Sequence, residues 1–337
     1  LPLREQTGGI DARLVSRTAL IAPGRCKKLL CTETKHTQAC KMSPPVQVIL
    51  GTMTFGWARS SSTVDSLLSG KMMDAFFDAG HKDVDTALVY SDGKTEAILG
   101  EICPPGSVRF GRMGCLATKA GPWEGLSMAG TGGLAPASVR TKIEASLKSL
   151  KRDSVDLYYL HAPDAQTNIE ETLAVVDELH KGGKIKALGL SNFQAWEVSH
   201  IYHTCAAKGY IKPSVYQGMY NCVTRDVEKE LLPCLRKLGI PFYAYNPLAG
   251  GILTGKHTKE DAPPPGRFKE NKMYLDRFWK DAYFDAIKAL NEECKSEGVT
   301  MTDASLRWLK NHSQLSGARG DGIIIGASSM EHLYDNL

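Results

Sequence analysis

The stretch VDLYYLH, residues 155–161, is a short apolar run that predicts a buried strand ending in His161. Two earlier runs, DVDTA and CLATK, carry Asp85 and Lys119 at or near their carboxyl ends, and Tyr90 follows the first of them. When parallel strands close into a barrel, their carboxyl ends meet on one face, where catalytic groups collect. An acid, a cation, a phenol and an imidazole on that face predict proton transfer to an oxygen atom.

Strand-like and helix-like runs alternate from residue 46 onward. The predicted strands are 46–51, 83–87, 116–119, 155–161, 186–192, 215–221, 241–247 and 322–326. The predicted helices are 65–78, 94–102, 137–150, 169–181, 195–208, 227–238, 281–296 and 303–311, with the start of another after the last strand. A Gly/Pro-rich stretch at 248–272 interrupts the alternation.

Eight strands alternating with helices predict a (β/α)8 TIM barrel, an α/β fold. The competing architecture is a doubly wound sheet, which would be expected to carry a GxGxxG turn after its first strand. The corresponding segment here, GTMTFG at 51–56, lacks that pattern. The sequence therefore favours the barrel.

Composition and charge narrow the function classes. The net charge of +4 is too weak to indicate nucleic-acid binding, and no apolar run approaches the ~18 residues needed to span a membrane. The nine cysteines are scattered without CxxC spacing, which is typical of reduced thiols in a cytoplasmic protein and indicates no metal site. His200 and His203 lie three apart on a predicted helix but lack a suitable third ligand nearby, which favours a solvated helix face.

The first 45 residues differ from the rest of the chain. They begin with Leu, are basic, and show no periodic apolar pattern. We therefore expect 1–45 to be a disordered or targeting-like extension, with organellar targeting left open, and 46–337 to be the barrel domain.

The four residues on the predicted catalytic face suggest separate roles. Tyr90 would be the general acid, since a phenol with an ordinary pKa of about 10 becomes a better proton donor beside an ammonium. Lys119 would supply that positive charge, and Asp85 would pair with Lys119 and hold it in place. His161 would hydrogen-bond the carbonyl oxygen of a substrate.

The later strand ends offer groups for an extended anionic ligand. Ser191, Asn192 and Gln217 could bind a carboxamide. The segment 246–251, NPLAGG, allows close backbone approach at its glycines and leads to Lys256, which could bind phosphate. The turn at 326–329 opens a helix whose amino terminus suits a phosphate.

These motifs resemble the aldo-keto reductase superfamily, most closely its aflatoxin-aldehyde and succinic-semialdehyde reductase branch. The segments that carry the resemblance are DVDTALVYSDGKTE (83–96), ATK (117–119), VDLYYLHAPD (155–164), GLSNFQAWEV (189–198), VYQGMYN (215–221), NPLAGGILTGK (246–256), GRF (266–268), LRW (306–308) and GASSMEHLYDN (326–336). The resemblance implies NADPH-dependent reduction of aldehydes and ketones.

Matching positions assign roles by resemblance. The implied catalytic residues are Asp85, Tyr90, Lys119 and His161. The residues implied to bind NADPH are Ser191, Asn192 and Gln217 at the nicotinamide, Asn246, Pro247, Leu248, Gly250, Gly251, Lys256 and Arg267 at the pyrophosphate, and Ser328, His332 and Asn336 at the adenosine end. Tyr274 and Arg277 match positions that contact substrate carboxylates, and His161 would contact the substrate as well.

The sequence departs from the branch at two points and leaves an alternative function open. His332 stands where the branch usually has Gln, and the sequence ends at Leu337, before the C-terminal tail expected to close the substrate pocket and supply an Arg. Voltage-gated potassium-channel β subunits share the barrel and the four catalytic residues, here called the tetrad (Asp85, Tyr90, Lys119 and His161), so a regulatory binding module is the alternative. A barrel that binds nucleotide without turnover is a further option, which the intact tetrad disfavours. Beyond a small aldehyde or ketone we expect neither nucleic acid nor membrane as a partner, and a homodimer is left open.

Overall fold

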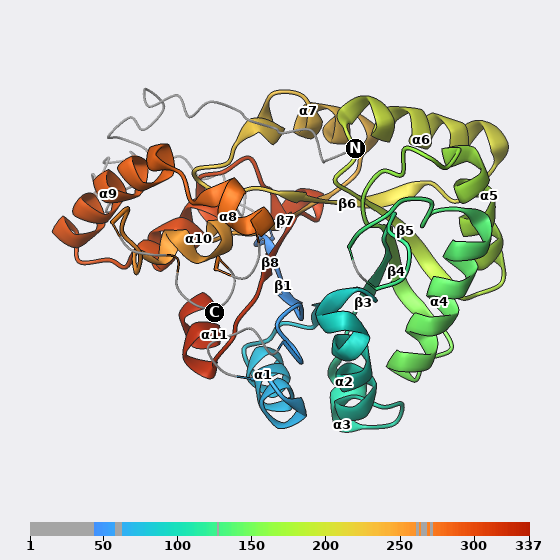
Figure 1. The fold of residues 1–337 in the computed structure, drawn as a ribbon, viewed down its shortest axis with the longest axis horizontal. Coiled ribbons are helices and arrows are strands. Elements are labelled where there is room, and N and C mark those ends of the chain that lie inside the picture. The colour runs from blue at the N-terminus through green and yellow to red at the C-terminus, as the bar shows by residue number, and fades with distance from the viewer. Residues whose placement is uncertain (1–43, 58–62, 127, 261–262, 264–267, 270–271) are drawn as a thin grey trace, which may run out of the picture.

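A computed structural model describes residues 44–57, 63–126, 128–260, 263, 268–269 and 272–337. Most of the expected N-terminal extension, and Arg267, lie outside these residues. Eight parallel strands close into one barrel in chain order. Figure 1 labels the strands. The strands are β1 (Gln47–Gly51), β2 (Asp83–Asp85), β3 (Leu116–Ala120), β4 (Val155–Leu160), β5 (Ile185–Ser191), β6 (Pro213–Met219), β7 (Phe242–Tyr245) and β8 (Gly322–Ile325). The predicted barrel is confirmed, and the doubly wound alternative is wrong.

Helices connect successive strands and surround the barrel (Figure 1). The α-helices are α1 (Ser66–Asp78), α2 (Lys94–Ile102), α3 (Val108–Arg112), α4 (Pro136–Leu150), α5 (Ile169–Lys181), α6 (Ala195–Lys208), α7 (Leu231–Leu238), α8 (Lys272–Phe278), α9 (Asp281–Ser296), α10 (Met301–Asn311) and α11 (Met330–Asn336). Short 3-10 helices are η2 (Tyr90–Gly93), η3 (Asp226–Glu228), η4 (Ala249–Thr254) and η5 (Gly317–Arg319).

Strand alternation decides which side chains face the barrel interior. In β3 and β4, Ala117, Leu157 and Tyr159 form a buried interior cluster. The intervening Tyr158 packs in the larger core between the strands and the helices. Because strand side chains alternate, Lys119 shares the interior face with Ala117, near the carboxyl end of its strand. The pleat therefore directs Lys119 into the barrel.

A second, smaller core forms between the segment predicted as an interruption and the helices that follow it. Ile252 from η4, Phe278 from α8, Phe284 from α9 and Met301 from α10 are all buried in it. Figure 1 shows α8, α9 and α10 gathered on one side of the barrel. This core anchors the segment after β7, so the residues at 246–256 and 274–277 are held beside the carboxyl ends of the strands.

Among the described residues, no helix is both long enough and apolar enough to cross a membrane. Within the same part of the chain, no three His, Cys, Asp or Glu side chains are grouped as metal ligands would be.

Candidate active site

Asp85 and Lys119 form a buried ion pair at the carboxyl ends of β2 and β3. Lys119 Nζ lies 2.5 Å from Asp85 Oδ1 and donates a second hydrogen bond to the carbonyl oxygen of Thr86 at 2.7 Å. The side chain of Lys119 is fully buried. Burial lowers the pKa of Lys119, and the Asp85 carboxylate partly offsets this effect. The predicted pairing of the two side chains is present in the structure.

Tyr90 lies against this pair at the start of η2. Lys119 Nζ is 3.4 Å from the Tyr90 hydroxyl. The backbone that follows is left-handed at Ser91 and Asp92, and the Ser91 hydroxyl donates to the carbonyl oxygen of Phe55 at 2.9 Å. This bond ties the loop that carries Tyr90 to the segment after β1. The tight turn therefore sets where the phenol stands relative to the ammonium.

The acidity of Tyr90 differs from the expected direction. Desolvation, and then the charge of Asp85, raise the pKa of Tyr90 well above its ordinary value. The nearby ammonium of Lys119 does not reverse this rise in the pKa, to which desolvation contributes most. Tyr90 consequently holds its proton at neutral pH, as a proton donor must.

His161 follows β4 directly, with its ring beside Tyr90. The two ring centres are 6.0 Å apart in an edge-to-face arrangement. Burial, and then the charge of Lys119, hold the pKa of His161 well below its ordinary value, so the imidazole is neutral at physiological pH. Within the described residues His161 Nδ1 has no hydrogen-bond partner. A neutral imidazole here can donate one ring N–H to a carbonyl oxygen.

The three predicted nicotinamide residues lie next to the tetrad. Gln217 Nε2 donates to Asp85 Oδ2 at 2.8 Å, so both carboxylate oxygens of Asp85 are engaged. Asn192 Nδ2 donates to the carbonyl oxygen of His161 at 2.9 Å and to Ser191 Oγ at 3.0 Å. The Tyr245 hydroxyl donates to Asn192 Oδ1 at 2.7 Å. Asn192 therefore braces the His161 backbone, a role the sequence did not indicate.

The segment after β7 has the backbone form that close ligand approach requires. Gly250 and Gly251 adopt φ values of 74° and 111°, which favour glycine. A Cβ on Gly251 would meet no atom within 4 Å, so its backbone faces open space. Asn246 Nδ2 is buried and, within the described residues, has no hydrogen-bond partner. These features fit a ligand that accepts hydrogen bonds. Pro247 and Leu248 contribute apolar side chains, and the carbonyl oxygen of Leu248 accepts from the Gly251 amide at 2.8 Å.

The segments after β7 and β8 meet at a basic cluster. Lys256 Nζ lies 3.4 Å from His332 Nε2, and Ser328 Oγ lies 3.2 Å from His332 Nδ1. Asn336 Nδ2 donates to the carbonyl oxygen of Gly326 at 3.1 Å. The structure thus brings together residues that the sequence assigned to two parts of one ligand. His332 joins them directly.

The two predicted substrate residues lie on α8, over the same end of the barrel. The Tyr274 hydroxyl donates to Asn246 Oδ1 at 3.3 Å. Burial raises the pKa of Tyr245 to about 12, against the opposing charge and hydrogen bond of Arg277. Arg277 is half-buried and lies near enough to Tyr245, at the end of β7, to lower the pKa of that phenol. Its position differs from that of a fully solvated surface charge.

Two neighbours of the tetrad were missed in the sequence. Trp123, in the loop after β3, lies edge-to-face with His161 at 5.4 Å between ring centres. Glu96 on α2 is fully buried and accepts a hydrogen bond from the Thr118 hydroxyl, on the outer face of β3. Burial raises the pKa of Glu96. A lone Trp in a loop and a Glu in a helix carry no sequence signal for such contacts.

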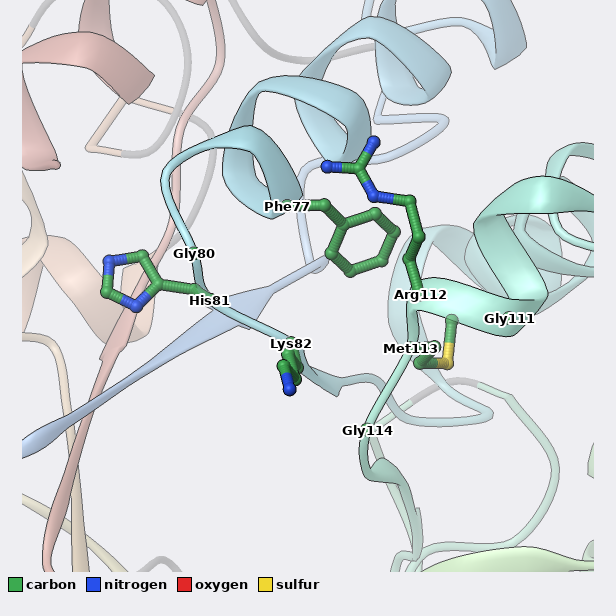
Figure 2. A pocket seen from close by; sticks show the side chains of 8 residues that line it. All are labelled: Phe77, Gly80, His81, Lys82, Gly111, Arg112, Met113 and Gly114. Carbon is green, nitrogen blue, oxygen red and sulfur yellow. The ribbon is translucent and has the colours of Figure 1, made fainter.

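An open cavity of about 370 Å³ lies at the opposite end of the barrel. Figure 2 shows it between the segments that lead into β2 and β3, with Lys82 and Gly114 on its wall. Arg112, also on the wall, pairs with Asp78 at 2.6 Å. None of the four tetrad residues lines this cavity, so we assign the chemistry to the other face.

Comparison with known proteins gives the family. The model of the aldo/keto reductase family matches residues 47–337. Human aflatoxin B1 aldehyde reductase member 2 is 45% identical over 341 residues, covering 97% of this chain and 90% of that protein. Human aflatoxin B1 aldehyde reductase member 4 is 47% identical and human aldo-keto reductase family 7 member A3 is 46% identical, each over 86% of this chain and 87% of its own length. The chain therefore belongs to the aldo/keto reductase family.

Proposed function

We propose that this protein reduces aldehydes and ketones to alcohols with NADPH, and that Tyr90 supplies the proton. The contact series from Asp85 through Lys119 to Tyr90, with the His161 ring alongside, carries the proposal. Two of the relatives are named as reductases of aflatoxin B1 aldehyde, which supports an aldehyde as the substrate class. Oxidation of NADPH in the presence of a panel of aldehydes tests the proposal, and no oxidation with any member would refute it.

Each residue of the tetrad has one task. Tyr90 donates its proton to the carbonyl oxygen as negative charge develops there. His161 donates a hydrogen bond to the same oxygen and fixes its direction. Lys119, held by Asp85, stabilises the phenolate that remains on Tyr90 after the transfer. The bound nicotinamide supplies a hydride for the carbonyl carbon.

The residues that would hold NADPH extend from β5 to α11. Ser191, Asn192 and Gln217 border the tetrad, where the nicotinamide ring would bind. The backbone at Gly251 supports a pyrophosphate position, and so does Asn246 Nδ2, which has no hydrogen-bond partner among the described residues. The cluster of Lys256, His332 and Ser328 suits the phosphate monoester on the adenosine part of NADPH, because a cation and hydrogen-bonding side chains converge there. This proposal moves Lys256 from the pyrophosphate, where the resemblance put it, to that extra phosphate. The assignment of Arg267 to the pyrophosphate stays a prediction.

Replacement of Lys256 by Met is expected to weaken NADPH binding about tenfold, since charge-assisted contacts to phosphate contribute roughly 1.5 kcal/mol or more. NADH, which lacks the extra phosphate, should bind almost as before. Titration of both cofactors by quenching of tryptophan fluorescence measures the two dissociation constants. Lys288→Met, an exposed change on α9, is the matched control. An equal loss for both cofactors would place Lys256 away from the extra phosphate.

Replacement of Arg277 by Met is expected to raise KM for aldehydes that bear a carboxylate, such as succinic semialdehyde. The guanidinium at the barrel mouth can grip a carboxylate through two parallel hydrogen bonds, which are stronger than neutral ones. The KM for uncharged para-nitrobenzaldehyde should stay nearly constant. Steady-state kinetics with both substrates separates the effects, and a parallel change in both would indicate that Arg277 only shapes α8.

The alternative of a channel-regulating binding module receives no support from these relatives, which are named as reductases. The cytoplasmic location stays a prediction, and the homodimer stays an open alternative.

A further inference from the structure

The long loop between β3 and α4 carries Trp123, whose ring contacts the His161 ring, and its two ends are drawn together at its base. The base residues Gly121 and Gly133 are buried, whereas Glu124 and Met128 in the middle are exposed. The amide of Gly133 donates to the carbonyl oxygen of Pro122 at 2.8 Å, which closes the base. Trp123 stands at this base. Its position therefore depends on whatever holds the two ends of the loop together.

A buried ammonium holds that base. Lys142, in the second turn of α4, donates to the carbonyl oxygens of Gly121 at 2.8 Å, Trp123 at 2.8 Å and Gly133 at 2.7 Å. Lys142 is only 7% exposed. All three of its donor positions are used, so the ammonium is fully satisfied by backbone groups. Burying an ammonium without such partners costs free energy, whereas a lysine exposed on a helix surface does not need them.

A carboxylate holds the far end of the same loop. Asp164 accepts hydrogen bonds from the amides of Gly132 and Leu134, both at 3.1 Å. Asp164 lies three residues after His161, in the segment that follows β4. The loop is thus fixed to the segment that carries His161, while Lys142 fixes it to α4.

The glycines at the base show how closely these parts fit. A Cβ on Gly121 would lie 2.4 Å from the Trp123 ring, so the indole packs directly on that backbone. A Cβ on Gly133 would lie 2.5 Å from Lys142 Nζ. The indole in turn contacts the His161 ring edge-to-face at 5.4 Å. Lys142 is therefore linked to the His161 ring through one intermediate residue, Trp123, whose backbone it holds and whose indole meets the imidazole.

We propose that Lys142 is a positioning residue that sets Trp123 against His161 and so fixes the pocket wall that orients an aromatic aldehyde. The inference rests on the proposed reduction of aldehydes. The expected effect of Lys142 is selective. The orientation of an aromatic ring that packs on Trp123 depends on Lys142, whereas that of a small aliphatic aldehyde does not.

Replacement of Lys142 by Met tests this proposal. We expect kcat/KM for para-nitrobenzaldehyde to fall roughly 10- to 100-fold, since a small misplacement of positioning groups has effects of that size. The value for propanal should change less than threefold, and NADPH should bind as before. Lys148→Met, an exposed change on the same helix, is the matched control. An equal fall for both aldehydes would overturn the proposal.

A double-mutant cycle with Trp123→Leu provides the second readout. If Lys142 acts through Trp123, the Lys142→Met change should have little further effect in the Trp123→Leu background. Additive losses would overturn the proposal. Should Lys142→Met fail to fold, Trp123→Leu alone must still lower the ratio of aromatic to aliphatic kcat/KM, and an unchanged ratio would contradict the inference.

Hydrogen exchange distinguishes this inference from the proposed function. The peptide that covers 121–134 should exchange faster in Lys142→Met than in the wild type, whether or not any aldehyde is reduced. If exchange is faster in Lys142→Met but the wild type turns over no aldehyde, the proposed function is refuted and the role of Lys142 in holding the loop stands. Unchanged exchange would refute that role of Lys142.

Discussion

Tyr90→Phe is expected to lower kcat roughly 10²–10⁴-fold, the usual contribution of a general acid. The change removes only the hydroxyl that lies 3.4 Å from Lys119 Nζ, and the ring can keep its place beside His161. NADPH should therefore bind with nearly unchanged affinity. Steady-state kinetics gives kcat, and quenching of tryptophan fluorescence gives the dissociation constant.

The control for this variant is Tyr202→Phe on α6, which removes a phenolic hydroxyl far from the tetrad and should leave kcat unchanged. Near-normal turnover by Tyr90→Phe would remove Tyr90 from the mechanism. A large loss of NADPH affinity would indicate instead that the hydroxyl supports the binding site.

Lys119→Met is expected to abolish most turnover and to destabilise the fold. The substitution removes the charge beside Tyr90 and leaves the Asp85 carboxylate buried without its counter-charge. Breaking a buried ion pair in this way typically costs about 3–5 kcal/mol in the free energy of unfolding. Urea unfolding measures the stability, and kcat is measured on the folded fraction.

The double variant Lys119→Met with Asp85→Asn separates the two effects. Removing the unpaired carboxylate should recover part of the lost stability, whereas turnover should stay low because the charge beside Tyr90 is still missing. Recovery of turnover together with stability would make Lys119 structural. An unchanged pH–rate profile in the single variant would point the same way, since the charge beside Tyr90 would then be irrelevant.

The barrel and the tetrad could be predicted because both depend on local pattern. Apolar runs such as VDLYYLH locate the strands, and barrel geometry brings the strand ends to one face. Asp85, Lys119 and His161 were thus placed together without knowledge of distances. The short helices α3 and α8 were missed, because elements of five and seven residues leave little periodic signal.

Contacts across the barrel could not be predicted from the sequence. Gln217 and Asp85 are 132 positions apart, and their hydrogen bond depends on how β2 and β6 face each other in the barrel interior. The pKa of Tyr90 likewise depends on burial and on the nearest carboxylate, which no local pattern gives. Lys142 looks like a surface charge on a helix until the loop that folds over it is seen.

The most direct test of the account follows the transferred atom. The protein is mixed with ortho-carboxybenzaldehyde and NADPH that carries deuterium at the transferred position, and the alcohol is analysed by mass spectrometry. We predict one deuterium on the carbinol carbon with the wild type, and product formation slowed roughly 10²–10⁴-fold with Tyr90→Phe. Alcohol without deuterium, or equal rates in the two proteins, would contradict reduction by hydride transfer with Tyr90 as the acid.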